Sequence, residues 1–596
     1  MSGLIRERPL ALIFDDLHWA DEASLTLLIN LVDLVLEKSL LFVCMTRPEN
    51  QTAFLQQVHD RLKERFNQIN LEPLGEDQAS MLLTNLVGAE GLPEPVREQI
   101  LKKVEGNPYF AEEMIRSLIE TRQIVRENSH WRMADKKVSL SLPGTLNGVL
   151  SARIDRLPED TKQLLQMASV IGRSFDLRLL HDLSNLDGSL DLHIQRLDQA
   201  GLIQPLEPEG YTFRHVLVQE AAYNSTLLKR RRALHQRIGG LLEGFHADRI
   251  EEYAPLLAYH FYNAEDERSL KYDLMAGEKA EHLYANAEAA TNYSRALETA
   301  KRIGAGKDQI GPIYRKLGHV LELDGRHDQA LANYEEMEAF AREAGDRALE
   351  LESLTARATI YSIFTQLHSP LLAEKMLIRA LDLARQIGDQ ASQAKLHWSL
   401  MLNYLFSKVI DKAVAHGEKA LPLAREIGDR EQLAFILNDL TRVYTCTGEF
   451  EKGYAVVNEA RNLWRALENQ SMLADSFGAE AEARYHAGDY DGALDCTAQS
   501  MEISETTGNL WGQAYNKMLM GFVNLDRGEV DKALPPMLDS IRMGDQAGLL
   551  ASSVAERAEL GWVYGSFGDI AKGLETCQES LNIAIEHWTA VRRNDP

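Results

Sequence analysis

Short apolar runs alternate with a helical pattern over the first 75 or so residues. The runs "LALIF" and "SLLFVCMTR" are short and mostly apolar, which is typical of buried strands. Between them, "DEASLTLLINLVDLVLEK" carries apolar residues at helical spacing, and "QINLEPL" further on has the pattern of a third short strand. A strand, a helix and a strand in this order predict a right-handed crossover and a parallel sheet.

Helical spacing with turn signals continues from about residue 76 to residue 245. "GEDQASMLLTNLV", "PEPVREQILKKVEG" and "NPYFAEEMIRSLIETRQIV" predict helices, because each starts with acidic residues or proline. "DLHIQRLDQAGLIQPLEPEGYTFRH" predicts a helix, a glycine break and two short strands. Helices followed by a small hairpin favour a winged-helix unit.

A segment that starts with glycine recurs every 40 residues in the second half of the chain. "GEFEKGYAVVNEA", "GDYDGALDCTAQS", "GEVDKALPPMLDS" and "GDIAKGLETCQES" begin at Gly448, Gly488, Gly528 and Gly568. A second glycine, often followed by aspartate, recurs between them, so each repeat predicts two helices joined by glycine-containing turns. A constant period of this length predicts a helical solenoid.

These repeats resemble tetratricopeptide repeats (TPRs) in a variant with extended helices, over about residues 310–590. The resemblance implies a protein or a peptide as the partner, but repeat architecture does not identify it. Several aromatic residues are candidates for the concave face, although their helical spacing favours ordinary packing. They are Trp398, Tyr404, Tyr444, Tyr485 and Trp511.

Charge and cysteine content narrow the class of protein. The 596 residues include 64 Lys and Arg against 89 Asp and Glu, a net charge of -25, which opposes non-specific binding to nucleic acid or an anionic membrane. The four cysteines lie far apart and favour reduced thiols in a cytosolic protein. The longest apolar region is broken by Asp33, Glu37 and Lys38, and no secretory signal is visible. We therefore expect a cytoplasmic protein with no membrane partner.

Two aspartates follow the first predicted strand in "ALIFDDLHWAD". Asp15 and Asp16 lie at its C-terminal end, the edge where open α/β sheets bind ligands. A carboxylate there can hold Mg²⁺ through water, and a neighbouring acid can orient an attacking water. The alternative is a pair of solvated turn residues.

The longer string "DDLHWADEASL", followed by "FVCMTRPE", resembles the STAND branch of AAA-like P-loop ATPases. These signalling ATPases consist of a nucleotide-binding domain, a helical lid, a winged helix and a repeat sensor. The resemblance implies that Asp15 is the magnesium-coordinating Walker B aspartate and Asp16 the adjacent catalytic acid. It also implies that Arg47 senses the terminal phosphate of ATP, and that ATP or ADP with Mg²⁺ is the cofactor. For Arg47 the alternative is a surface arginine after a strand.

Two further segments resemble parts of the same family. "EGNPYFAEE" resembles the glycine–proline motif of the STAND lid, which implies that Pro108 packs near the adenine; an ordinary helix start explains the same residues. His215 lies where STAND proteins often place a histidine that faces the diphosphate, although a half-buried strand-end histidine is the favoured alternative. The basic run Lys229–Arg232 favours a solvated or ion-paired face over a DNA contact, so we expect no nucleic-acid partner.

No phosphate-binding loop of the form G-x-x-x-x-G-K-[ST] precedes Asp15. "RIGAGKDQIG" contains Gly306 and Lys307, but Asp308 follows where a hydroxyl should bind magnesium, so we interpret this segment as a connector. We expect the chain to start inside a nucleotide-binding domain and not to hydrolyse ATP efficiently. The alternatives are a misplaced start at Met1 or a loop supplied by a partner chain.

The sequence thus predicts a mostly α protein with a truncated α/β P-loop-type sheet, a helical lid, a winged helix and a TPR-like α-solenoid. The expected segments are 1–75, 76–135, 136–245, the linker helices 246–310 and the repeats 311–596. The main hypothesis is a regulatory signalling fragment, a STAND-type ATP-binding switch with a TPR scaffold. The alternatives are part of an ATPase-regulated adenylate or guanylate cyclase or protein kinase, or a winged-helix transcription regulator. Self-association stays open.

Overall fold

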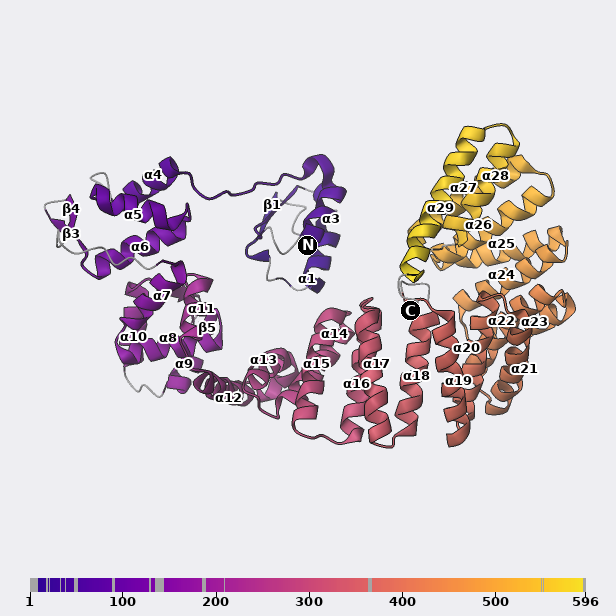
Figure 1. The fold of residues 1–596 in the computed structure, drawn as a ribbon, viewed down its shortest axis with the longest axis horizontal. Helices are drawn as coiled ribbons and strands as arrows, with labels where there is room; N and C mark the ends of the chain where they lie inside the picture. The colour runs from indigo at the N-terminus through magenta and orange to yellow at the C-terminus, as the bar shows by residue number, and fades with distance from the viewer. Residues whose placement is uncertain are drawn as a thin grey trace. The chain divides into compact units, whose positions relative to one another are not determined.

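The chain folds into two compact units, Met1–Ile313 and Tyr314–Pro596. The computed structural model describes residues 9–17, 20, 22–32, 34–37, 39–47, 52–87, 92–127, 130–133, 144–184, 189–207, 210–362, 367–547, 549 and 551–592. The chain is mostly helical, its small sheets lie in the first unit, and a long series of paired helices follows, which confirms the predicted fold class (Figure 1). The finer division into five segments stays a prediction.

The first unit opens with a two-stranded parallel sheet. Its elements are β1 (Leu10–Phe14), α1 (Glu22–Val32), α2 (Leu34–Glu37), β2 (Leu40–Cys44), α3 (Thr52–Leu62) and the 3₁₀ turn η3 (Lys63–Arg65). The strands pair from Leu10 opposite Leu40 to Phe14 opposite Cys44. Leu28 of α1 and Val58 of α3 pack in one buried cluster over one face of this sheet. The predicted strand, helix and strand are therefore present.

The predicted third strand in "QINLEPL" is wrong. Residues 66–75 have no regular secondary structure, and Ile69 and Leu71 are exposed. An apolar alternation stabilises a strand only where a neighbouring strand satisfies its backbone groups and a core covers its side chains. The described residues supply neither at this position.

Three helices and a hairpin come next. They are α4 (Glu76–Val87), α5 (Glu94–Val104), α6 (Pro108–Glu120), β3 (Ile124–Glu127) and β4 (His130–Met133). The helix predicted through "TRQIV" is too long, since α6 ends at Glu120 and Ile124 enters a strand. Arg122 adopts a left-handed conformation, with φ of 54°, and this ends the helix.

A second small sheet lies among the helices that follow. The elements are α7 (Leu146–Asp155), α8 (Glu159–Ile171), β5 (Ser174–Asp176), α9 (Leu177–Ser184), α10 (Leu190–Gln199), β6 (Ile203–Leu206) and β7 (Gly210–Phe213). The strands pair antiparallel in the order β5-β7-β6. As predicted, a glycine with positive φ, Gly201, separates the helix from the hairpin. The predicted helix and hairpin are present, and the assignment of this region to a winged helix stays a prediction.

Longer helices complete the first unit. They are α11 (Val216–Asn224), α12 (Leu228–Phe245), the turn η4 (Ala247–Arg249), α13 (Ile250–Asn263), α14 (Ser269–His282) and α15 (Asn286–Arg302). The next helix, α16 (Lys307–Leu323), starts at Lys307. The fragment that contains Gly306 and Lys307 therefore joins two helices and has no preceding strand, as the sequence predicts for a connector.

The second unit is a solenoid of paired helices. After α16 come α17 (His327–Glu343), α18 (Arg347–Ser362), α19 (Pro370–Ile387), α20 (Gln390–Phe406), α21 (Ile410–Ile427), α22 (Arg430–Thr447), α23 (Phe450–Ala466), α24 (Gln470–His486), α25 (Tyr490–Thr506), α26 (Leu510–Asp526), α27 (Val530–Ala547), the π-helical segment η5 (Ala551–Glu556), α28 (Arg557–Ser566) and α29 (Ile570–Arg592). The four glycines of the 40-residue period all have positive φ, which confirms the predicted turns.

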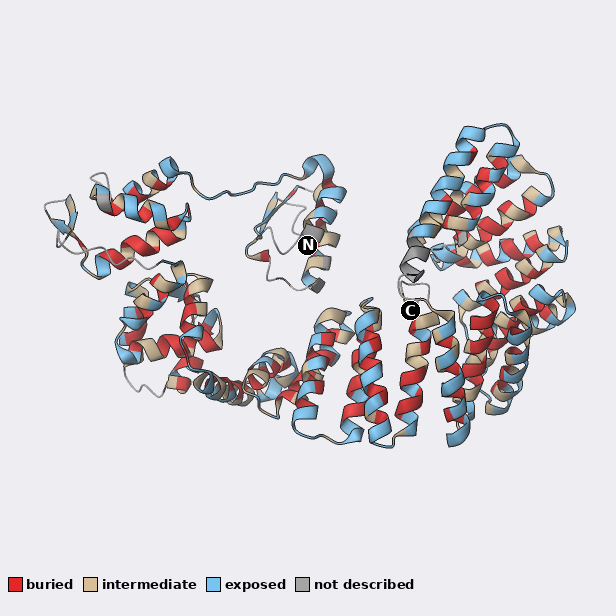
Figure 2. Ribbon diagram, viewed as in Figure 1, coloured by how far each residue is buried: buried red, intermediate tan, exposed pale blue. Residues whose placement is uncertain are grey.

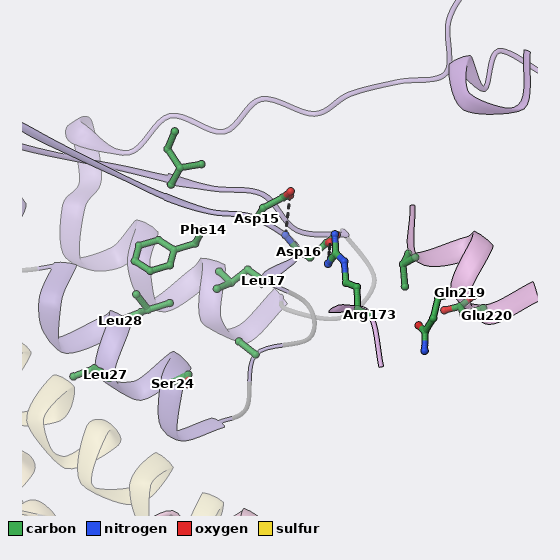
Figure 3. Close-up of a pocket in the computed structure, with 13 residues that line it drawn as sticks. Phe14, Asp15, Asp16, Leu17, Ser24, Leu27, Leu28, Arg173, Gln219 and Glu220 are labelled. Carbon is green, nitrogen blue, oxygen red and sulfur yellow. Dashed lines mark hydrogen bonds and ion pairs between the residues drawn. The ribbon is translucent and has the colours of Figure 1, made fainter. Parts of the chain in front are cut away.

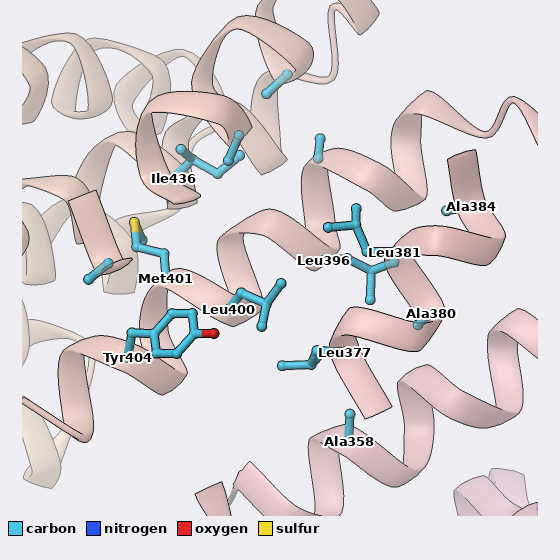
Figure 4. Close-up of a cluster of buried hydrophobic side chains, with 14 of the residues drawn as sticks. Ala358, Leu377, Ala380, Leu381, Ala384, Leu396, Leu400, Met401, Tyr404 and Ile436 are labelled. Carbon is cyan, nitrogen blue, oxygen red and sulfur yellow. The ribbon is translucent and has the colours of Figure 1, made fainter. Parts of the chain in front are cut away.

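Small and large apolar residues interlock between the helices of this solenoid. Ala380 and Ala384 allow α19 to approach its neighbours, and Leu400 and Met401 of α20 fill the space between them (Figure 4). Buried residues face one another across neighbouring helices, while the opposite faces are exposed (Figure 2). Within the described part of the chain, no helix is long and apolar enough to cross a membrane.

Candidate functional site

The C-terminal ends of β1 and β2 place three predicted site residues at one edge of the sheet. The ladder continues past the strands, because Met45 N donates to Phe14 O at 2.8 Å and Leu17 N donates to Met45 O at 2.9 Å. Asp15 and Asp16 follow β1, and Arg47 follows β2. Asp16 adopts a left-handed conformation with φ of 54°, which turns the chain sharply after the strand.

Asp16 is ion-paired with Arg173, the residue that directly precedes β5. Arg173 Nη1 lies 2.8 Å from Asp16 Oδ2. The backbone of Arg173 is held in place, since its carbonyl oxygen accepts hydrogen bonds from Phe213 N and from Thr212 Oγ1. The sequence reasoning missed Arg173. In the sequence, Arg173 is marked only by the glycine before it and the apolar helix before that. Such a pattern is too common to indicate a functional residue.

An open hollow of about 820 Å³ lies at this edge of the sheet. Figure 3 shows Arg173 reaching Asp16, with Gln219 and Glu220 of α11 beyond it. The apolar lining comes mainly from Phe14, Leu17, Leu27, Leu28 and Val216. The volume is within the range of small-molecule sites. Its charged lining includes Asp15, Asp16 and Glu220 against Arg173, so the hollow alone does not attract phosphate.

A second contact joins the segment "GNPYF" to the start of α11. The rings of Tyr109 and His215 stack with centroids 4.1 Å apart and an interplanar angle of 12°. Pro108 is the first residue of α6, and the Asn107 side chain caps that helix by accepting from Phe110 N at 3.0 Å. The helix start therefore explains Pro108, and its neighbour Tyr109 makes the contact with His215.

His215 caps a helix, and its burial favours the neutral ring. It caps α11, where its Nδ1 accepts from Leu217 N at 3.1 Å. Burial lowers the pKa of His215, Asp16 opposes this effect, and the positive charges of Arg173 and Arg47 add to it. A neutral ring that accepts at Nδ1 carries its proton on Nε2. Such a ring is able to donate a hydrogen bond to an anion.

The predicted site residues converge only in part. Asp15 and Asp16 line the hollow, whereas Pro108, His215 and Arg47 do not. The Asp15 carboxylate suits Mg²⁺ chemically, since Mg²⁺ prefers oxygen ligands and keeps several waters. The Asp16 carboxylate is already paired with Arg173. Among the described residues, no group of three or more His, Cys, Asp or Glu side chains is arranged to hold a metal ion.

A buried ion pair ties α6 to α7. Arg153 Nη1 contacts Glu113 Oε2, and both side chains are almost fully buried. Arg153 Nη2 also lies 3.1 Å from Glu120 Oε1 and donates to Ala200 O. Since a buried charge is stable only when it is paired, this contact couples the two regions strongly.

Two residues of the basic run on α12, Arg231 and Arg232, contact other residues of the chain. The Arg231 guanidinium lies 4.8 Å from the centroid of the Tyr223 ring, and Arg232 is ion-paired with Glu265. These contacts agree with the predicted ion-paired face.

The solenoid has a polar ladder along successive helices. The helices α20, α22, α24 and α26 contact one another in turn. Trp398 Nε1 donates to Asp439 Oδ2 at 2.9 Å, and Arg442 bridges Asp439 Oδ1 at 3.1 Å and Asp475 Oδ1 at 2.9 Å. Burial raises the pKa of Asp439, so this ladder is poorly solvated.

The candidate aromatic residues of the repeats differ in their exposure. Tyr404 and Tyr444 are buried, as the packing interpretation predicts. Trp511 is exposed and stacks on Tyr515 with centroids 5.6 Å apart.

Comparison with known proteins gives one family model and several similar chains. Residues 75–132, which run from the start of α4 into β4, match a domain of unknown function, DUF8739. A curated relative, an uncharacterised protein of Rhizobium meliloti (strain 1021), is 25% identical over 250 residues. The match covers 40% of this chain and 23% of that protein, so the chain spans about a quarter of the relative's length.

Three solved structures illustrate the structural similarity. One is a Signal Transduction ATPase with Numerous Domains (STAND) protein with a tetratricopeptide repeat sensor from Pyrococcus horikoshii, with TM-score 0.37, 16% identity and coverage of 98% of this chain and 81% of that one. Another is the apo form of RapI, with TM-score 0.43, 14% identity and coverage of 62% and 94%. The third is the apo quorum sensor NprR of B. thuringiensis, with TM-score 0.38, 15% identity and coverage of 60% and 97%.

Proposed function

We propose that the chain is a regulatory module of the STAND type, in which a nucleotide-dependent switch is joined to a scaffold that binds a protein or a peptide. The observation that carries the proposal is the pair of contacts that join three chain segments. Arg173 contacts Asp16, and Tyr109 stacks on His215. The sequence resemblance supports the same proposal, because the two STAND-like motifs contribute Asp16 and Tyr109.

In this proposal the side chains have separate roles in holding a nucleotide. His215 donates through Nε2–H to a phosphate oxygen, and Arg47 faces the terminal phosphate. Asp15 would hold Mg²⁺, and the ion would supply positive charge that neutralises the phosphates. While Arg173 holds the Asp16 carboxylate, this acid is not available to orient a water, so the Arg173–Asp16 pair favours the inactive state.

We place the partner on the polar ladder of the solenoid. Trp398 and Arg442 are tied to the carboxylates of the ladder there, and Tyr515 donates to Glu482 at 2.8 Å further along it. Half-buried polar groups with aromatic neighbours are typical of protein-binding surfaces. The scaffold role therefore requires a polypeptide ligand of this face.

The test is a titration of the 596-residue chain with fluorescent ADP in the presence of Mg²⁺. We expect binding that His215→Ala weakens several-fold and that His319→Ala, at an exposed position of α16, leaves unchanged. Wild type that binds no ADP would overturn the switch.

Phosphate release in the same samples distinguishes the switch from an enzyme. We expect no turnover of ATP above background. Turnover that Asp16→Asn removes would favour an active ATPase instead. We do not propose DNA binding, because Arg231 and Arg232 are engaged by Tyr223 and Glu265.

A further inference from the structure

The polar ladder of the solenoid contains a charged cluster with more carboxylates than cations. Arg442 of α22 is its cation, and the guanidinium contacts the carboxylates of Asp439 and Asp475. A third carboxylate belongs to Glu482, whose Oε2 lies 3.7 Å from Arg442 Nε. One positive charge cannot neutralise three carboxylates, so the cluster has an excess of negative charge.

The carboxylates of this cluster are half-buried. The side chains of Asp475 and Glu482 are 25% and 31% exposed, so a ligand can reach them although much of their hydration is lost. They lie on α24, one of the helices that contact one another in turn, and in a curved row of helix pairs these helices lie on the inner side. A negative charge that is partly shielded from water attracts a cation more strongly than one on an open surface.

A buried acceptor beside these carboxylates lacks a donor. Asn438 is 1% exposed, and its Nδ2 donates to Asp475 Oδ2 at 2.6 Å. Within the described part of the chain, Asn438 Oδ1 has no hydrogen-bond partner. Such an acceptor is costly to leave unpaired, and a ligand that brings N–H donors would satisfy it. The cluster therefore offers acceptors and negative charge to a ligand.

Aromatic rings occupy the equivalent repeat positions on both sides of the cluster. In the 40-residue register, Asp475 corresponds to Phe435 in the preceding repeat and to Tyr515 in the following one. The ring of Phe435 lies beside that of Trp398, with centroids 5.6 Å apart. Lys395 comes one repeat before Phe435, so the ring position lies between this lysine and the cluster in the register. Aromatic faces attract cations, so these rings suit the same kind of ligand as the carboxylates.

We propose that the polar ladder binds its polypeptide partner through an arginine or lysine side chain, which donates to the carboxylates of Asp475 and Glu482. A guanidinium or ammonium group supplies several N–H donors and a positive charge, and it has no acceptor. The alkyl part of either side chain packs on the rings of Phe435 and Tyr515. The inference rests on the scaffold role proposed above and adds the chemical class of the side chain that the scaffold selects.

An array of immobilised random heptapeptides, probed with the full chain, tests this preference. We expect the peptides that wild type binds to be enriched in arginine or lysine, and Asp475→Asn/Glu482→Gln to lose this enrichment. Asp495→Asn/Glu502→Gln is the control, because it removes two carboxylates at the same spacing from exposed positions of α25. Both double variants change the net charge equally, so a general attraction of basic peptides to this acidic chain does not distinguish them.

The outcomes separate the side-chain preference from the scaffold role. An enrichment that survives in Asp475→Asn/Glu482→Gln, or that the α25 control also loses, would overturn the preference. Wild type that binds peptides without enrichment in arginine or lysine would overturn it too, and the scaffold role would stand. Wild type that binds no peptide would contradict the scaffold role itself.

A change in the peptide tests the same contact without altering the protein. In the tightest-binding arginine peptide of the array, citrulline in place of arginine removes the charge and keeps the shape of the side chain. Fluorescence anisotropy should show binding about 10- to 100-fold weaker for the citrulline peptide, because hydrogen bonds between charged groups are lost. Equal affinity of the two peptides would refute the proposed contact.

Discussion

Arg173 Nη1 lies 2.8 Å from Asp16 Oδ2, although 157 residues separate them in the sequence. The contact joins the end of β1 to the start of β5. Its energy is small, because the Arg173 side chain is 50% exposed and that of Asp16 is 31% exposed. The pair therefore adds little to stability, and it can open without unfolding the chain.

Arg173→Ala should remove the ion pair with Asp16 without unfolding the protein. We expect a change of about 0–1 kcal/mol in the free energy of unfolding, as for exposed ion pairs. Amide hydrogen exchange should become faster in the turn at Asp16 and Leu17, because the turn loses its anchor. Arg97→Ala, which removes an exposed pair with Glu94, is the control. Unchanged exchange at the turn in Arg173→Ala would show that the ion pair does not hold the turn in place.

Removal of the Tyr109 ring should change the titration of His215. Burial lowers the pKa of His215, and the stacked ring contributes to that burial. In Tyr109→Ala we expect the pKa to rise toward its ordinary value of 6.5, as followed by NMR. Tyr109→Phe keeps the stack and should keep the lowered pKa. An equal pKa in the two variants would show that the ring does not shield His215.

Loss of Arg153 should destabilise the first unit severely. Arg153→Ala leaves the Glu113 carboxylate buried without its partner, which costs about 3–5 kcal/mol. The measurement is urea unfolding followed by tryptophan fluorescence, to which Trp131 of the first unit contributes, with its Nε1 donating to Val87 O.

Two variants control for the loss of positive charge at Arg153. Arg156→Ala removes an exposed arginine that is also ion-paired with Glu120. It should lower the free energy of unfolding by about 0–1 kcal/mol. Arg153→Met/Glu113→Gln removes both buried charges and should be less destabilised than Arg153→Ala. A double variant as unstable as Arg153→Ala would contradict the assigned cause.

A buried histidine pair should make the first unit sensitive to acid. His235 Nδ1 lies 3.0 Å from His260 Nδ1, and burial lowers their pKa values to about 4 and about 3 from 6.5. Because the folded state disfavours the charged rings, their contribution to stability is present above pH 6.5 and is lost as the pH falls toward 4 and 3. In His260→Asn, the free energy of unfolding should depend less steeply on pH between about 4 and 7.

Glu556 should have the opposite pH dependence in the second unit. Burial raises the pKa of this carboxyl group to about 8 from 4.5, so the folded state favours its neutral form. Stability linked to this group is present below pH 4.5 and is lost as the pH rises through 8. Glu556→Gln should gain stability relative to wild type with rising pH, as measured by thermal unfolding. A difference that does not change with pH would show that Glu556 is not protonated in the folded protein.

Local sequence signals predicted most of the secondary structure. Gly488 was predicted to end a helix in the left-handed conformation, and its φ is 82°. Such signals act within a few residues, so they can be read without the fold. The failures are equally specific. "QINLEPL" has the pattern of a strand but no strand to pair with, and Ile124 follows a helix that ends at Glu120.

The site could be predicted only in part, because local signals do not record contacts between residues that are far apart in the sequence. Asp15 and Asp16 follow β1, and Arg47 follows β2. Because these strands are parallel neighbours, their C-terminal ends lie at the same edge of the sheet. Arg173 and Tyr109 carry no comparable signal. Their importance comes from the neighbours that they meet, and those neighbours are far away in the sequence.

The sequence by itself determined the parallel strand pair, the helices, the 40-residue repeat and the acidic charge, because each depends on local spacing or on composition. Only the tertiary structure decided that Arg173 is ion-paired with Asp16 and that Tyr109 stacks on His215. Packing brings distant residues together, and no local pattern records which partner a side chain finds or whether one covers it.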